Sequence, residues 1–265
     1  MKMHILVSND DGINSEGIWA LVNELKKVAD VTVVAPEKQM SAVGHAITVQ
    51  YPLRVNPFYK NGEFFGYAVD GTPADAVKLA VKAILKDKKI DLLISGINHG
   101  TNTSINIIYS GTVSAATEGT ILGIPSIAIS LATYAPNPDF TFSAKFAVKL
   151  AEFVFKNGLP RGTLLNVNVP PVPENEIKGV RVTRQGNAFW DDWFELRKDP
   201  NGRDYYWLTG KFVNYDQEDL DADHTAVQNN FISITPIHFD LTNYKMIEVL
   251  KNSGLENLLQ GLDKD

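Results

Sequence analysis

Two adjacent carboxylates near the N-terminus, Asp10 and Asp11, are the side chains of this sequence best suited to chemistry. They stand between the apolar run 5–7 and a helical pattern of apolar residues over 18–28. Neighbouring like charges disfavour each other's ionisation unless a cation or hydrogen bonds offset the repulsion. Residues 8–12 therefore predict a turn between a strand and a helix, which is either an ordinary helix-capping turn or a metal site, and the pentapeptide alone does not favour the metal.

Two further oxygen donors follow later strands of the pattern. Ser41 lies in the loop after the β-branched run 31–36, and Asn98 lies in a Gly- and Asn-rich turn, 96–102, after the run 90–95. Together with Asp10 and Asp11 they form an all-oxygen donor set, which suits Mg²⁺ or Mn²⁺, with Ca²⁺ as a further candidate. Zn²⁺ fits poorly because the chain has no Cys and only 5 His.

A candidate anion site precedes the small-residue helix expected up to about residue 123. Hydroxyls at Ser110 and Thr112 flank Gly111, and the start of a helix attracts anions, although the same pattern is also an ordinary helix cap. A cation beside an anion site indicates phosphoryl chemistry. The sequence contains neither a P-loop nor a dinucleotide fingerprint.

Composition excludes several classes of protein. The 265 residues carry a formal charge of -6 without a basic run, which argues against a polymeric nucleic-acid partner. The first apolar run is too short for a signal peptide or a membrane span, and the lack of Cys is compatible with a reducing compartment. These features predict a cytoplasmic protein without a membrane partner.

The periodicity predicts an α/β fold: a three-layer, doubly wound, mainly parallel sheet of the Rossmann-like type. The expected strands cover 5–7, 31–36, 90–95, 124–130, 164–169, 180–183 and 231–237, with a further strand at 46–49 and a hairpin within 52–67. The expected helices cover 18–28, 73–85, 113–123, 143–156 and 241–250. Thr72, Pro73 and Asp75 form a capping-box pattern at the start of the second helix.

An aromatic segment, 185–212, contains three of the four Trp residues around a turn at 200–202. It predicts a C-terminal β-hairpin arm that needs an apolar surface, supplied either by the chain's own sheet or by another subunit. We expect one domain over 1–265, with an α/β core at 1–170, the arm and final strand at 171–240, and a helix and tail at 241–265.

Taken in order, these motifs resemble the survival protein SurE family, a family of metal-dependent nucleotidases. The resemblance covers almost the whole chain and rests on the segments 8–12, 71–75, 95–102, 109–113, 166–170, 183–185 and 232–236, together with Ser41, Asp223, Ala226 and Val227. Two positions depart from the family pattern: Ala76 replaces a frequent Cys, and Asn230 replaces a frequent Gly near the arm.

The resemblance implies hydrolysis of nucleoside 5'- or 3'-monophosphates, with short polyphosphate as a further substrate. It also implies a homodimer or homotetramer that exchanges C-terminal arms. The implied ligands of one divalent cation per subunit are Asp10, Asp11, Ser41 and Asn98. The implied phosphate contacts are Asn9, Asn102, Ser110, Gly111 and Thr112.

The expected mechanism is in-line attack of a water on phosphorus, with Asp10 or Asp11 as the base. A carboxylate nucleophile remains an alternative to water. His45 and His99 are candidates to protonate the leaving group, although a loop His is also typical of an ordinary surface. Two other classes stay open, a non-catalytic nucleotide-binding regulator and a metal-dependent nucleotide-sugar transferase.

Overall fold

The computed structural model describes residues 2–261, so residues 262–265 of the expected C-terminal tail lie outside the described residues. The strands are β1 His4–Ser8, β2 Asp30–Pro36, β3 Val55–Lys60, β4 Glu63–Val69, β5 Leu92–His99, β6 Ser126–Leu131, β7 Thr163–Val169, β8 Gly179–Val182, β9 Ala188–Lys198, β10 Asp204–Asn214 and β11 Phe231–His238. The α-helices are α1 Glu16–Leu25, α2 Pro73–Leu79, α3 Asn106–Tyr109, α4 Gly111–Ile121, α5 Thr141–Asn157, α6 Asp223–Gln228 and α7 Tyr244–Asn252. A π-helical turn, Ala80–Ile84, continues α2, and short 3₁₀ turns cover Glu174–Glu176 and Leu255–Gly261.

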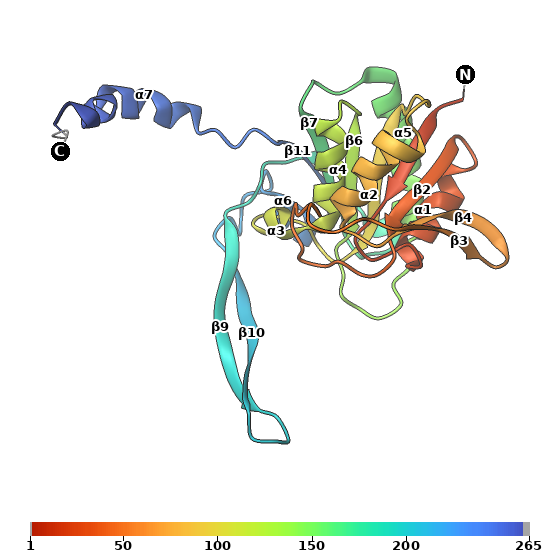
Figure 1. The fold of residues 1–265 in the computed structure, drawn as a ribbon, viewed down its shortest axis with the longest axis horizontal. Coiled ribbons are helices and arrows are strands. Elements are labelled where there is room, and N and C mark those ends of the chain that lie inside the picture. The colour runs from red at the N-terminus through yellow and green to blue at the C-terminus, as the bar shows by residue number, and fades with distance from the viewer. Residues whose placement is uncertain (1, 262–265) are drawn as a thin grey trace.

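Across residues 2–261 the main sheet has nine strands in the order β3-β4-β2-β1-β5-β6-β7-β11-β8. The five central strands, β2, β1, β5, β6 and β7, run parallel to one another. Strand β11 is antiparallel to β7, and β3 is antiparallel to β4. Helices α1 and α5 pack together on one face and α2 and α4 on the other (Figure 1). The expected doubly wound, mainly parallel α/β fold is confirmed.

The central strands are apolar because both faces of the sheet are covered. The side chains of Ile5, Leu6 and Val7 in β1 are fully buried, and they divide between two apolar cores, one on each side of the sheet. Since parallel strands end at the same edge, β1 and β5 present the residues that follow them at a common carboxyl edge.

Two expectations about secondary structure are wrong. Residues 46–49 form no strand: Ile47 and Val49 are 50% and 81% exposed, and Thr48 bonds to the Asp75 carboxylate rather than to a sheet. Residues 96–99 are not a turn, because β5 continues to His99 and its pairing with β6 resumes at Asn98 and Ser130. Gly96 permits this course, since a Cβ there would lie 2.3 Å from the Ile129 carbonyl oxygen.

The helix ends predicted from the sequence agree with the structure to different degrees. The capping box of Thr72 and Asp75 forms at the start of α2, and Pro73 is its first residue, as predicted. The helix expected at 18–28 ends at Leu25, and the one expected at 241–250 begins at Tyr244. The short helices α3 and α6 were not predicted, because four and six residues offer too little periodicity.

The hairpin of β9 and β10 is confirmed, and it projects away from the body of the protein (Figure 1). Within residues 2–261 these two strands pair only with each other. In this structure the arm does not lie on the chain's own sheet, and the surface that covers it stays a prediction. Helix α7 lies well apart from the sheet and has no buried residue.

Candidate functional site

Asp10 lies just beyond β1, against the first turn of α4. Its side chain is 4% exposed, and its Oδ1 accepts a hydrogen bond from the Thr112 hydroxyl. Gly111 makes this contact sterically feasible, because a Cβ at that position would lie 2.7 Å from the Asp10 Cβ and 3.0 Å from Oδ2. The predicted metal ligand and the predicted anion-binding turn are therefore in direct contact.

Burial raises the pKa of Asp10 from 3.8 to about 6, and the adjacent charge of Asp11 acts in the same direction. The Thr112 hydroxyl opposes the shift by bonding to the carboxylate. Ionised Asp10 is thus destabilised in the folded chain, which is the situation that a bound cation relieves.

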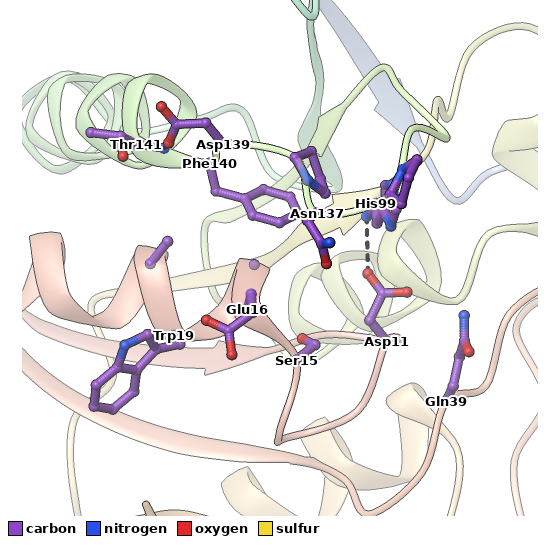
Figure 2. Close-up of a pocket in the computed structure, with 14 residues that line it drawn as sticks. Asp11, Ser15, Glu16, Trp19, Gln39, His99, Asn137, Asp139, Phe140 and Thr141 are labelled. Atoms are coloured by element: carbon purple, nitrogen blue, oxygen red, sulfur yellow. Dashed lines mark hydrogen bonds between the residues drawn. The ribbon is translucent and has the colours of Figure 1, made fainter. Parts of the chain in front are cut away.

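Asp11 faces a different cavity from Asp10. Its Oδ2 accepts a hydrogen bond of 2.9 Å from the His99 backbone N–H, and it lines a neighbouring cavity of about 590 Å³ with Trp19, Gln39 and Asn137 (Figure 2). Burial raises the pKa of Asp11 as well, and the His99 N–H opposes that shift. His99 lines both cavities and so forms part of the wall between them.

The structure brings five of the nine predicted site residues into one pocket of about 170 Å³ at the carboxyl edge. These five are Asp10, Ser41, Asn98, Asn102 and Ser110. The other lining residues include Asn106, Tyr109 and Tyr134, which sequence reasoning missed. Tyr109 opens the segment 109–113 and Asn106 starts α3 just before it, so their proximity to Ser110 in sequence could have suggested both, whereas Tyr134 lies in a loop without a motif.

Three predicted residues lie behind the pocket wall. Gly111 is buried beneath Asp10, and Thr112 is fully buried with its hydroxyl committed to Asp10. The fully buried Asn9 donates from Nδ2 to the Gly12 carbonyl and the Ser15 hydroxyl, both at 2.9 Å. In this structure Asn9 and Thr112 therefore support the turn and Asp10, and their contact with phosphate stays a prediction.

The loop that carries Ser41 is attached to both sides of the pocket. The Met40 N–H donates to the Asp10 carbonyl at 2.7 Å, and the Gly44 N–H donates to the Tyr109 carbonyl at 2.9 Å. Ser41 itself is exposed, and its hydroxyl accepts a hydrogen bond of 2.9 Å from Gln39. The loop thus holds a solvent-accessible hydroxyl over buried Asp10.

Asn102 is fixed by the ends of β6 and β7. The Asn168 Oδ1 accepts from the Asn102 N–H at 2.8 Å, and the Asn166 amide donates to the Asn102 carbonyl at 2.8 Å. The Asn102 side chain donates to the Ser130 hydroxyl at 2.8 Å. The Asn residues of β7 therefore act as supports for the pocket.

The two candidate proton donors differ in position. The His45 ring lies 3.0 Å from the buried Glu118 carboxylate and lines neither cavity. The His99 ring lies at the wall between the cavities, with its Nε2 2.9 Å from the Ala135 carbonyl. Of the two, only His99 lines the pocket, and proton transfer by either ring stays a prediction.

The chemistry of the donor set fits a hard cation. Asn98 donates from Nδ2 to the Gly100 carbonyl at 2.8 Å, which leaves its Oδ1 to act as a ligand beside the Asp10 carboxylate. Residues 2–261 contain no group of three His, Cys, Asp or Glu that could hold a metal ion. A cation in this pocket would therefore be held by the Asp10 carboxylate and neutral oxygens, a kind of donor set that Mg²⁺, Mn²⁺ and Ca²⁺ accept, and Asp11, which lines the neighbouring cavity, stays a predicted ligand.

Fold and pocket together define a doubly wound α/β protein with an oxygen-lined pocket at the carboxyl edge of its parallel strands. A sequence profile described as Survival protein SurE matches residues 5–192. The chain belongs to this family, as the resemblance in its motifs predicted.

Curated relatives and a solved structure agree with this assignment. The chain is 52% identical over 249 residues to a 5'-nucleotidase SurE of Syntrophus aciditrophicus, a match that covers 94% of this chain and 93% of the relative. It is 48% identical to a 5'-nucleotidase SurE of Chlorobaculum tepidum, with 98% and 97% covered. The crystal structure of the SurE protein from Aquifex aeolicus matches with a TM-score of 0.81 at 43% identity, covering 94% of this chain and 99% of the other.

Within residues 2–261, no helix is both long enough and apolar enough to cross a membrane.

Proposed function

We propose that the protein is a metal-dependent 5'-nucleotidase, a hydrolase that releases phosphate from nucleoside 5'-monophosphates. The observation that carries the proposal is the pocket shared by Asp10, Ser41, Asn98 and Ser110. The names of the relatives from Syntrophus aciditrophicus and Chlorobaculum tepidum support it. Hydrolysis of nucleoside 3'-monophosphates and short polyphosphate extends the same proposal.

In this proposal one divalent cation per subunit is held by Asp10, Asp11, Ser41 and Asn98. Mg²⁺ and Mn²⁺ are the first candidates and Ca²⁺ is a further one, because every donor is an oxygen. When bound, the cation supplies Lewis-acid polarisation of a phosphoryl oxygen. The raised pKa of Asp10 supports this assignment, since a cation compensates the cost of burying its charge.

The remaining groups bind the phosphate and move protons. The Ser110 hydroxyl, the Gly111 N–H at the start of α4 and the Asn102 amide orient the phosphate, and the helix dipole favours its negative charge. Asp10 or Asp11 accepts the proton of the attacking water. His99, at the wall between the two cavities, is the candidate that protonates the leaving oxygen.

The arm supports an assembly of copies of this chain. We expect a homodimer or homotetramer in which β9 and β10 of one subunit pack on another. Trp193, Phe194 and Tyr206 are 46%, 67% and 63% exposed, and apolar surface of this extent favours a protein partner. The single-domain arrangement of 1–170, 171–240 and 241–265 is part of the same proposal.

A substrate panel tests the proposed function. Chelator-treated protein is supplied with Mg²⁺ or Mn²⁺ and assayed on 5'-AMP, 3'-AMP, an aryl phosphate and a nucleotide sugar. We expect metal-dependent phosphate release from the monophosphates. Release of nucleoside diphosphate from the nucleotide sugar alone would instead indicate a transferase, and silence on every substrate would indicate a non-catalytic regulator.

A further inference from the structure

Asp223, the first residue of α6, is a fully buried carboxylate outside the predicted site. It makes no ion pair within the part of the chain that the structure describes. Its charge is instead met by four donors: Ser104 N–H at 2.9 Å, Ser104 hydroxyl at 3.1 Å, Gly186 N–H at 3.0 Å and His224 N–H at 2.7 Å. Burying a carboxylate with this many hydrogen bonds costs desolvation energy and fixes every group that donates to it.

Asp223 joins two segments that are far apart in sequence. Ser104 belongs to the loop that leads into α3, and Gly186 belongs to the root of the hairpin arm. The same two segments are also joined by Gln185, whose side chain donates to the Ser104 carbonyl at 2.9 Å. Trp190 of β9 donates from its indole N–H to the Asn106 side chain at 2.8 Å. The arm root and the loop are therefore one hydrogen-bonded unit.

The conformation of Ser104 needs this support. Its φ of 54° lies in the left-handed region, which residues other than Gly, Asn and Asp seldom adopt. The packing around it is close, since a Cβ at Gly186 would lie 2.7 Å from the Ser104 hydroxyl and 2.9 Å from Asp223 Oδ1. Asp223 meets both donors of Ser104 and so stabilises the strained conformation.

Residues that line the pocket lie on both sides of Ser104 in the sequence. Asn102 precedes Ser104 by two residues and Asn106 follows it by two, and both line the pocket of about 170 Å³. Asn102 is also bonded to β6 and β7, whereas the Asn106 side chain is bonded to Trp190 of the arm. The bend at Ser104 therefore determines how the two amides approach a ligand together.

We propose that Asp223 is a positioning residue for substrate binding, which clamps Ser104 to the arm root and thereby sets Asn102 and Asn106 against the phosphate. This inference rests on the proposed function, and it makes the root of the arm part of the substrate site. Asp223 itself does not line the pocket. Its effect is on binding geometry and not on the proposed metal ligands, which lie just after β1, in β5 and in the Ser41 loop.

The test compares Asp223→Asn with Asp221→Asn in the full-length protein. Asp221 is a matched control, because it lies in the same segment but its carboxylate is exposed and forms a long ion pair of 3.7 Å with Arg181. We expect Asp223→Asn to raise KM for 5'-AMP by about tenfold while kcat changes by less than about threefold. The Kd for Mn²⁺ measured without substrate is expected to stay the same, and Asp221→Asn is expected to change none of these quantities.

Hydrogen exchange gives a readout that does not need activity. In Asp223→Asn, amide protection is expected to fall in both 102–106 and 185–190 and to stay unchanged in β1 and β5. An unchanged KM overturns the inference, as does a loss of Mn²⁺ affinity together with lost protection in β1 and β5, which indicates general destabilisation. If the parent protein hydrolyses no phosphomonoester, the proposed function fails and the exchange data alone test the role of Asp223. Loss of protection in both 102–106 and 185–190 then supports that role, and unchanged protection overturns it.

Discussion

The carboxyl edge of the sheet and the hairpin arm differ in where their side chains find partners. At the edge, Asp10, Thr112 and Asn102 are buried and bond to groups of the same chain. On the arm, Trp207 and Leu208 are 56% and 60% exposed, although they lie in a regular strand. The polar groups of the carboxyl edge thus find their partners within the chain, whereas the arm exposes apolar side chains of the kind that another protein surface covers.

The first prediction changes the carboxyl edge and leaves the arm intact. Asp10→Asn keeps the shape and an acceptor for Thr112 but removes the charge that would hold a cation. We expect metal-dependent phosphate release to fall by about 10³-fold or more. The oligomeric state measured by light scattering is expected to stay the same. Full activity of the chelator-treated variant would contradict the metal mechanism.

The second prediction shortens the arm and leaves the carboxyl edge intact. Residues 192–210 are replaced by a two-residue Asn-Gly turn, which closes the hairpin at the Asp191 and Lys211 pair and keeps the root contacts of Trp190. We expect the oligomer to dissociate in light scattering, while the Kd for Mn²⁺ stays that of the parent. An oligomer that survives this truncation would show that the exposed arm is not its interface.

A smaller effect is expected from Gly111→Ala, which tests how tightly the edge is packed. The new Cβ would lie 2.7 Å from the Asp10 Cβ and 3.1 Å from the Pro73 ring, so the carboxylate must move. We expect kcat/KM to fall by about 10- to 100-fold, because displacements near 1 Å have effects of this size. Ser114→Ala is the control in the same turn, since among residues 2–261 its hydroxyl bonds to the Ser110 carbonyl alone. Equal losses in both variants would argue against a specific effect at Asp10.

The smallest effect concerns stability without metal. The pKa of Asp10 is raised from 3.8 to about 6 in the folded chain, so its ionisation destabilises the fold fully above pH 6 and not at all below pH 3.8. We expect chelator-treated Asp10→Asn to be more stable than the parent by about 2–3 kcal/mol at pH 8, with the difference shrinking toward pH 4. Urea unfolding at both pH values measures this. A difference of opposite sign, or one that does not change with pH, would contradict the burial cost assigned to Asp10.

Much of the edge was predictable because buried strands and turns leave regular marks in a sequence. The run before Asp10 is fully buried in β1, and Ser110 caps α4 by accepting from the Val113 N–H, as its position indicated. The hairpin arm was predictable from its clustered aromatics and its central turn. Its isolation from the sheet was not, because the sequence pattern could not distinguish a surface of the chain itself from that of a partner.

The sequence could not predict the directions of individual side chains or the contacts between residues far apart in the chain. Asp10 and Asp11 are adjacent in sequence but line different cavities, since consecutive side chains leave the backbone in different directions. Tyr134 reaches the pocket from a loop without a motif. The alternating apolar residues Ile47 and Val49 mimic a strand, yet the segment is tied to α2 by the bonds of Thr48 to Asp75.

The most direct test of the central claim is a Mn²⁺ titration of the metal-free protein followed by electron paramagnetic resonance. The parent chain is expected to bind one Mn²⁺ per subunit. Asp10→Asn and Asn98→Ala are expected to weaken that site, whereas His45→Ala, whose ring faces Glu118 outside the pocket, is expected to retain it. A single tight site that persists unchanged in Asp10→Asn would contradict the assignment of the cation to this edge of the sheet.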